Sequence, residues 1–211
     1  MTGQIAPPSN CALCPRLADF RAANRQKYPA WHNAPVPAFG GLDARLLVVG
    51  LAPGLKGANR TGRPFTGDYA GDLLYATLKN FGFARGDYEA RPDDTLHLVD
   101  ARVTNAVRCL PPENKPVGAE AKACRNYLTR EIDAMANLRV IVALGTIAHA
   151  NILAALGLRK AAYPFGHGAL HELPGGLILA DSYHCSRYNT NTGRLTTQMF
   201  LSVFGAIRDR I

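Results

Sequence analysis

Four of the five cysteines in this 211-residue chain are spaced as metal ligands are. Cys11 and Cys14 form a Cys-x-x-Cys pair near the N-terminus, and Cys109 and Cys124 follow much later. Four thiolates from two distant segments suit a tetrahedral zinc site or a [4Fe–4S] cluster, and their number does not distinguish the two. Four unrelated cysteines are the alternative, and Cys185 stands apart as an ordinary buried thiol.

A second candidate is the glycine-rich segment GLAPGLKGANRTGRPFTGDYAGDLL, which runs from Gly50 to Leu74. Its glycines and Pro53 predict a tight loop whose backbone N–H groups converge on a ligand oxygen, with Asn59, Arg60 and Arg63 adding polar reach. The segment contains neither G-x-x-x-x-G-K-S/T nor G-x-G-x-x-G, so a nucleotide-phosphate loop is not indicated. A glycine-rich surface loop without a ligand is the alternative.

Two further polar segments contain side chains that suit recognition of a base and stabilisation of an anion. Asn105 lies in TNAVRCLPPENKP, and an amide offers both a donor and an acceptor to the edge of a base. His184 opens HCSRYNTNTGRL, where its ring could donate to a developing anion while neighbouring residues hold a phosphate. Their simpler interpretations are a turn asparagine and a structural histidine.

These segments follow predicted buried strands, and helical patterns lie between the strands. Alternation of this kind predicts a single-domain α/β/α sandwich around a central four-stranded parallel sheet, in which ligands bind beyond the carboxyl ends of the strands. Residues 1–43 form a lead-in carrying the first cysteine pair, with an exposed irregular stretch at 28–41. The predicted strands are Arg45–Leu51, Leu96–Asn105, Arg139–Gly145 and Leu177–His184. The predicted helices are Ala70–Phe81, Ala119–Ala136, Thr146–Leu156 and Gly193–Ile211.

Composition and charge predict the kind of partner and the location of the protein. A formal charge of +8, from 24 basic against 16 acidic residues, favours a polyanionic partner such as nucleic acid. The opening residues lack an apolar core behind a basic start, and no apolar run is long enough to span a membrane. The sequence therefore predicts a soluble cytoplasmic protein, monomeric and without a membrane partner, whose cysteines stay reduced rather than forming disulfides.

The three strand-end motifs, GLAPG with NRTGRPFTGD, TNAVRCLPPENKP and HCSRYNTNTGRLT, occur in an order that resembles the uracil-DNA glycosylase superfamily. The resemblance is most specific to its family 5, the type B iron–sulfur enzymes, and it covers the chain from Cys11 to about Thr197. It implies a monofunctional base-excision repair enzyme that hydrolyses the N-glycosidic bond of uracil in DNA. It also implies a [4Fe–4S] cluster on Cys11, Cys14, Cys109 and Cys124.

By the same resemblance, the residues divide into three roles. Asp68, Asn114 and His184 are catalytic, with Asp68 placing the water and an N-cap as its alternative role. The base contacts are Gly50, Leu51, Ala52, Gly54, Phe65, Asn105 and His184. The DNA contacts are Arg60, Lys115, Ser186 and Arg187.

The chain departs from family patterns in two places. Cys185 replaces the usual proline after the histidine, which predicts a looser loop. Leu51 stands where family 4 has a glutamate, so water must be positioned from elsewhere, as in family 5. Two other functions remain open: a glycosylase that prefers hypoxanthine, xanthine or etheno lesions, and a non-catalytic iron–sulfur or zinc module that binds DNA.

Overall fold

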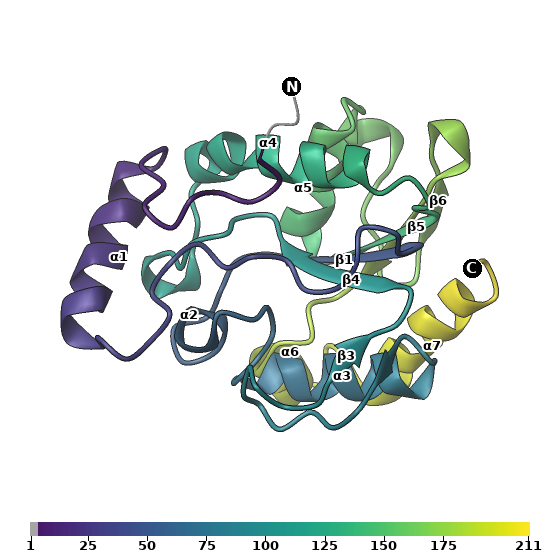
Figure 1. Cartoon of the computed structure of the whole chain (residues 1–211). Helices are drawn as coiled ribbons and strands as arrows, with labels where there is room; N and C mark the ends of the chain where they lie inside the picture. Colours follow the sequence, from purple (N-terminus) through teal and green to yellow (C-terminus); the bar gives the residue numbers. More distant parts are fainter. Residues whose placement is uncertain (1–3) are drawn as a thin grey trace.

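The computed structural model describes residues 4–211 and has a mostly parallel sheet with helices on both faces (Figure 1). The strand order is β4-β1-β5-β7-β6. The four parallel strands predicted from the sequence are confirmed, each within one or two residues at its carboxyl end. They are β1 (Leu46–Gly50), β4 (Ala101–Asn105), β5 (Val140–Leu144) and β7 (Ile178–Ser182).

The sheet has one more strand than predicted. β6 (Leu170–Glu172) pairs antiparallel with β7 at the edge of the sheet. Its three residues are only partly buried or exposed, so they lack the apolar run that identifies the central strands. The predicted strand Leu96–Asn105 was also wrong in its first half. Asp100 has a left-handed backbone (φ 53°) and separates β4 from β3 (His97–Leu98), which pairs with β2 (Ala84–Arg85) in a small second sheet.

Side chains of β1 alternate between the two faces of the sheet and explain the layers. Leu46 and Val48 pack in one apolar cluster, and Leu47 and Val49 pack in the other. In Figure 1, α4 (Gly118–Ala134) and α5 (Thr146–Ala155) lie above the sheet, and α3 (Tyr69–Asn80) and α7 (Thr197–Arg208) lie below it. Strands buried on both faces need apolar residues at every position, which is why LLVVG and VIVAL were predictable.

The helix predictions were accurate for α3, α4 and α5 and less so elsewhere. The predicted helix Gly193–Ile211 begins only at Thr197, whose N-cap Thr196 accepts a hydrogen bond from the backbone of Met199. Short helices lie at α2 (Ala58–Thr61) and α6 (Arg187–Asn191), and single 3-10 turns lie at Pro112–Asn114, Lys160–Ala162 and Pro174–Gly176.

The predicted lead-in is more ordered than expected; its residues 1–3 lie outside the described residues. It contains α1 (Pro15–Lys27), which begins directly after Cys14. The stretch 28–41 is irregular as predicted, but residues 33–36 are buried rather than exposed. Asn33 accepts a hydrogen bond from Asn59 at 2.9 Å, and the Val36 N–H donates to the Arg108 carbonyl at 2.7 Å. Backbone hydrogen bonds, which residue type does not reveal, hold this stretch in place.

Among residues 4–211, no helix combines the length and hydropathy that a bilayer span requires.

One buried acid joins α4 to the strand and loop that carry candidate site residues. The Glu131 carboxylate is fully buried and accepts hydrogen bonds from Arg102 of β4 at 2.6 Å and from the equally buried Arg108. Removing one member of such a network leaves an uncompensated buried charge.

We therefore expect Glu131→Gln to lower the free energy of unfolding by about 3 kcal/mol or more, because both guanidinium groups lose their counter-charge. Urea denaturation measures the change. Glu172→Gln, at an exposed position of β6, is the matched control and should change stability by less than about 0.5 kcal/mol. Equal losses in the two variants would show that the Glu131 network contributes no specific stability.

Candidate functional site

A cavity of about 680 Å³ opens beyond the carboxyl ends of the parallel strands. It is lined by residues from the loops after β1, β4, β5 and β7, which come together only in the folded chain. Most residues predicted for the site contribute to its lining: Leu51, Ala52, Gly54, Asp68, Asn114, His184, Ser186 and Arg187.

A narrow recess of about 30 Å³ adjoins this cavity and is lined by two more of the predicted base contacts, Phe65 and Asn105, whereas Gly50 lines neither space. The recess and the cavity share Asp68 and His184 in their walls, so the two spaces are continuous. The Phe65 ring lies 5.9 Å from the His184 ring at an angle of 26°. The recess therefore combines an aromatic face, an amide and an imidazole, which is a donor set suited to a flat polar ring.

The end of β1 can approach these side chains because residue 50 is a glycine. A Cβ at Gly50 would lie 2.4 Å from Phe65 Cζ and 2.5 Å from Asn105 Oδ1. Phe65 itself has a left-handed backbone (φ 51°), which few non-glycine residues adopt. The recess thus depends on backbone geometry at two positions.

His184 is neutral in this environment. Burial lowers the pKa of His184 to about 4, because the surrounding protein disfavours the charged ring. Its Nδ1 is buried and has no hydrogen-bond partner within residues 4–211. One ring nitrogen of a neutral imidazole carries hydrogen, so His184 can donate to an anion without itself being charged.

The loop that carries His184 is anchored at both ends. Cys185 is fully buried, and its thiol donates to the Ala70 carbonyl at 3.5 Å. Asn189 donates its side-chain N–H to the His184 carbonyl at 2.9 Å, and its backbone N–H to Ser186, the N-cap of α6. Cys185, which stands where the family has proline, packs in the core and gives this loop a contact that depends on its side chain.

Asp68 occupies the N-cap position of α3, but its side chain makes no capping hydrogen bond. Its Oδ1 is buried without a hydrogen-bond partner in the part of the chain that the structure describes. Burial raises the pKa of Asp68 above its ordinary value, because a carboxylate loses solvation there. Asp68 therefore stands at a helix-cap position and is at the same time part of the cavity wall.

Asn114 lines the same cavity from an exposed loop. It is exposed and lies with Glu113 in a left-handed turn, with φ of 57° and 54°. Because two successive left-handed residues reverse the chain, the turn directs this segment back to the cavity that Asp68 lines.

The structure places other predicted polar residues away from the cavity lining. Arg60 is exposed and donates to the Lys56 carbonyl at 2.9 Å, and Lys115 is exposed beside Glu113 at 3.3 Å. Arg63, expected to extend toward a ligand, is instead buried in a bidentate ion pair with Asp94 at 2.7 Å.

Several cavity residues were missed in the sequence: Lys56, Tyr69, Phe165, Tyr183 and Arg194. Arg187 lies 5.4 Å from the centre of the Tyr69 ring, and Arg194 lies 4.7 Å from that of Tyr183, which gives two cation–π pairs on the cavity wall. Three of the five fall within the motifs already identified, whereas no pattern marked Phe165.

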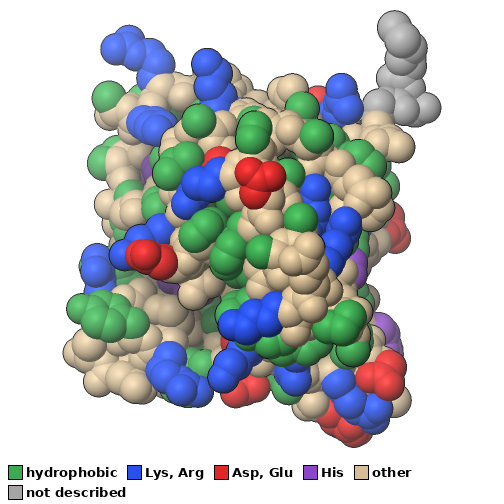
Figure 2. Space-filling view, turned by 90° about the vertical axis from the view of Figure 1, so that its left-hand side faces the viewer, with side chains coloured by type: hydrophobic (Ala, Val, Ile, Leu, Met, Phe, Trp, Pro, Cys, Tyr) green, Lys and Arg blue, Asp and Glu red, His purple; other side chains and the backbone are tan. Residues whose placement is uncertain are grey.

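The side of the molecule with α1 and α2 shows basic side chains spread among few acidic ones (Figure 2).

The four predicted metal ligands, Cys11, Cys14, Cys109 and Cys124, line a separate small pocket. Burial raises the pKa of Cys109 to about 12 and also raises the pKa of Cys124 and of Cys14. The Arg21 guanidinium is buried and donates to Cys109 Sγ at 3.5 Å. A cation beside clustered thiols suits a site whose ligands become thiolates when metal binds.

The chain is similar to known proteins over most of its length. The family model described as the uracil DNA glycosylase superfamily matches residues 37–208. A type-5 uracil-DNA glycosylase of Thermus thermophilus is 50% identical over 92% of this chain and 90% of that protein. One of Pyrobaculum aerophilum is 40% identical over 92% and 86%. A type-4 uracil-DNA glycosylase of the same organism is 35% identical over 71% and 63%. Identity and coverage are both higher for the type-5 relatives.

We expect Gly50→Ala to lower the free energy of unfolding by about 1–3 kcal/mol, because the added Cβ forces Phe65 and Asn105 from their positions. Thermal and urea unfolding measure this loss. Gly118→Ala is the control, since a Cβ there meets no atom within 4 Å. Equal stability of the two variants would mean that the end of β1 has room for a side chain.

Proposed function

The chain belongs to the uracil-DNA glycosylase superfamily, and from that premise we propose that it removes uracil from DNA by hydrolysing the N-glycosidic bond. The observation that carries the proposal is the convergence of neutral His184, Phe65 and Asn105 on one recess that opens into the cavity lined by Asp68. A monofunctional glycosylase needs these elements: a pocket for one base, a donor for the leaving group and a group that activates water.

The recess receives the base after the nucleotide has rotated out of the duplex, because neither the base edge nor C1′ is accessible within the stack. Phe65 provides the stacking face, and Asn105 offers a donor and an acceptor to the pyrimidine edge. The backbone of Leu51, Ala52 and Gly54 lines the cavity, and Gly50 lies directly before it against Phe65 and Asn105; N–H groups of this segment are the candidate donors to the ring oxygens.

His184 stabilises the leaving group. As the C1′–N1 bond breaks, its electron pair passes to the uracil ring, and the negative charge develops on the ring oxygens. A neutral imidazole N–H donates to one of these oxygens more strongly in the transition state than in the ground state, which raises the rate more than the affinity. The His184 ring is buried, and an electrostatic interaction is stronger in a buried position than in bulk water.

Asp68 places the attacking water and stabilises the sugar cation, with Asn114 as its partner across the cavity. Water adds to C1′, one water proton passes to the Asp68 carboxylate, and the base anion later takes a proton. A carboxylate can both accept a proton and stabilise positive charge, whereas an amide can only orient the water. The unpartnered, buried Oδ1 of Asp68 supports this division of labour.

DNA binding relies on cations around the cavity. Arg187 and Ser186 lie at its wall and suit the phosphates beside the rotated nucleotide, and Arg60 and Lys115 are exposed for contacts further along the strand. The cavity-lining Lys56 joins this set. The enzyme acts on this DNA as a monomer.

Other deaminated bases are a second class of substrate. The recess walls include Ala52, Gly54, Ala58 and Ala70, whose small side chains leave the recess open toward the larger cavity. A larger ring such as hypoxanthine therefore meets no bulky side chain at this opening.

The cysteine pocket fits a [4Fe–4S] cluster held by Cys11, Cys14, Cys109 and Cys124. Four sulfurs around one zinc ion are about 3.8 Å apart, since each Zn–S bond is about 2.3 Å. Among the described residues, no three of these sulfurs lie within 4.8 Å of one another, and ligands to four different irons need the wider spacing. Such a cluster would supply structural support in this pocket, by tying the N-terminal segment to the segment after β4.

We expect Asp68→Asn to lower single-turnover excision of uracil by roughly two to four orders of magnitude, since it removes the base and the charge. Because burial raises the pKa of Asp68, the wild-type rate should fall on acidification at a higher pH than an ordinary aspartate would give. That acid limb should disappear in the variant, while His184 stays neutral down to about pH 4.

Asp72→Asn is the matched control, because Asp72 is exposed one turn further along α3, and excision should stay within about twofold of wild type. Near wild-type excision by Asp68→Asn, with loss in Asn114→Ala, would assign the water to Asn114 instead. No excision by the wild-type protein on single- or double-stranded uracil DNA would refute the proposed function.

The metal assignment predicts a brown protein with broad visible absorbance and about four irons per chain when purified without oxygen. Cys14→Ser should lose iron and lower the melting temperature first, with excision falling as a consequence of unfolding. Zinc without iron in anaerobically purified wild type would contradict the cluster.

A further inference from the structure

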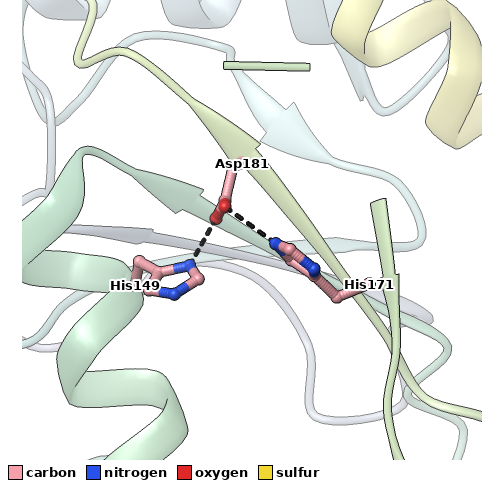
Figure 3. Close-up of side chains that lie close together, drawn as sticks. All are labelled: His149, His171 and Asp181. Carbon is pink, nitrogen blue, oxygen red and sulfur yellow. Dashed lines mark hydrogen bonds and ion pairs between the residues drawn. The ribbon is translucent and has the colours of Figure 1, made fainter. Parts of the chain in front are cut away.

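A cluster of two histidines and one aspartate lies at the β6 side of the sheet (Figure 3). Asp181 of β7 is fully buried and contacts two histidines, His149 of α5 and His171 of β6. Asp181 Oδ1 lies 2.7 Å from His149 Nδ1, and Oδ2 lies 3.2 Å from His171 Nε2. None of the three lines the cavity, so the mechanism above does not use them.

Hydrogen bonds hold the His149 ring at both nitrogens. Nε2 lies 2.8 Å from the Tyr163 carbonyl oxygen, and Nδ1 lies 2.7 Å from Asp181 Oδ1. A carbonyl oxygen can only accept a hydrogen bond, so Nε2 donates to Tyr163. His149 therefore links Asp181 of β7 to the segment that follows α5.

Histidine and aspartate also bind metal ions. The distance between their ligand atoms distinguishes a metal site from a hydrogen bond. Two ligands of one zinc ion, each at about 2.0–2.1 Å, lie about 3.3 Å apart in a tetrahedral site. The 2.7 Å between His149 Nδ1 and Asp181 Oδ1 is instead the distance of a charge-assisted hydrogen bond.

This cluster holds the segment 163–168 against the end of β7. The Gly166 N–H donates to Asp181 Oδ2 at 3.2 Å, and the Gly168 N–H donates to the Asp181 carbonyl at 2.8 Å. Two residues after Asp181, the Tyr183 N–H donates to His167 Nδ1 at 3.1 Å, and the Tyr183 and His167 rings stack with their centres 4.9 Å apart. The segment and the strand end that precedes His184 are thus bonded as one unit.

The unit presents two aromatic rings to the cavity, Phe165 and Tyr183. The Phe165 ring lies 5.6 Å from the His149 ring, edge-on at 85°, and 6.1 Å from the Tyr183 ring. Both rings line the cavity, but neither lines the base recess. They are therefore available to the DNA that flanks the rotated nucleotide rather than to the base in the recess.

We infer that Phe165 and Tyr183 form an aromatic wall that stacks on a base flanking the rotated nucleotide, and that His149 and Asp181 are its positioning residues. The inference rests on the proposed function, since it concerns the same DNA. Base–aromatic stacking contributes to affinity without requiring a particular sequence, because every base has a π-face.

The first experiment measures affinity for a duplex containing 2′-fluorinated deoxyuridine, which resists excision, beside single-turnover rates on ordinary uracil DNA. Phe165→Ala should raise the Kd roughly tenfold or more and lower the rate at saturating enzyme much less. Phe81→Ala is the matched control, since Phe81 packs against the core near α7 and away from the cavity, and its Kd should match wild type. His149→Ala should raise the Kd in the wild-type background and add little in Phe165→Ala.

The second experiment uses Asp181→Asn, which keeps the shape of the side chain. Its amide N–H can donate to His149 Nδ1, and its oxygen can accept from Gly166 and His171, so the segment stays bonded. The Kd of Asp181→Asn should therefore stay closer to wild type than that of His149→Ala.

Three results would overturn the inference. One is a Phe165→Ala Kd equal to that of Phe81→Ala, and another is an equal effect of His149→Ala with and without Phe165. The third is zinc bound outside the cysteine pocket and lost in His171→Ala. The proposed function fails separately, if wild-type protein does not excise uracil, because the affinity measurements do not need excision.

Discussion

The site depends on the close approach of three segments at the end of β1, and Gly50 makes that approach possible. Phe65 and Asn105 lie within van der Waals distance of the position that a Cβ would occupy, so any other residue would separate the β1 loop from the end of β4. The parallel register sets this meeting point, since Gly50 pairs directly with Asn105. The recess is thus a consequence of strand register together with one missing side chain, and the polar groups around it are placed by the backbone.

Two polar side chains near this recess, Asp68 and His184, lose solvation because they are buried. Asp68 has a buried oxygen without a hydrogen-bond partner among residues 4–211, and His184 is held neutral by burial. Both arrangements lower stability locally, because a solvated carboxylate or an exposed imidazole would be more favourable. In the mechanism that we propose, they also leave both groups free to interact with charges that exist only during the reaction, the sugar cation and the base anion. The burial that lowers stability at these two side chains is thus the same burial that would preorganise them for the reaction.

The sequence predicted the parts of this molecule that follow from burial and spacing. LLVVG and VIVAL could only be central strands, and the polar residues after them could only meet at one edge. It did not predict β6, because LHE has neither length nor apolar content, nor the buried path of residues 33–36, which backbone hydrogen bonds determine. Phe165 was missed because an aromatic between two irregular turns has the same local pattern in a core and in a cavity wall. The contact at Cys185 was also not predicted: proline stiffens a loop locally, whereas the buried thiol contacts Ala70 through tertiary packing, which no local rule describes.

The cysteine pocket and the recess lie on two sides of one short segment. From Asn105, the chain passes through Val107, whose N–H donates to the Leu51 carbonyl at 3.0 Å, and reaches Cys109. Val107 packs with Leu17 of α1, and Ala52 of the recess wall packs on the same apolar cluster. Arg108, between them, is fixed by Glu131. Because Asn105 and Asn114 flank Cys109, a metal group bound there would restrain both asparagines from the opposite side of the segment. A cofactor in this pocket can thus support catalysis by position alone, without exchanging an electron or contacting DNA.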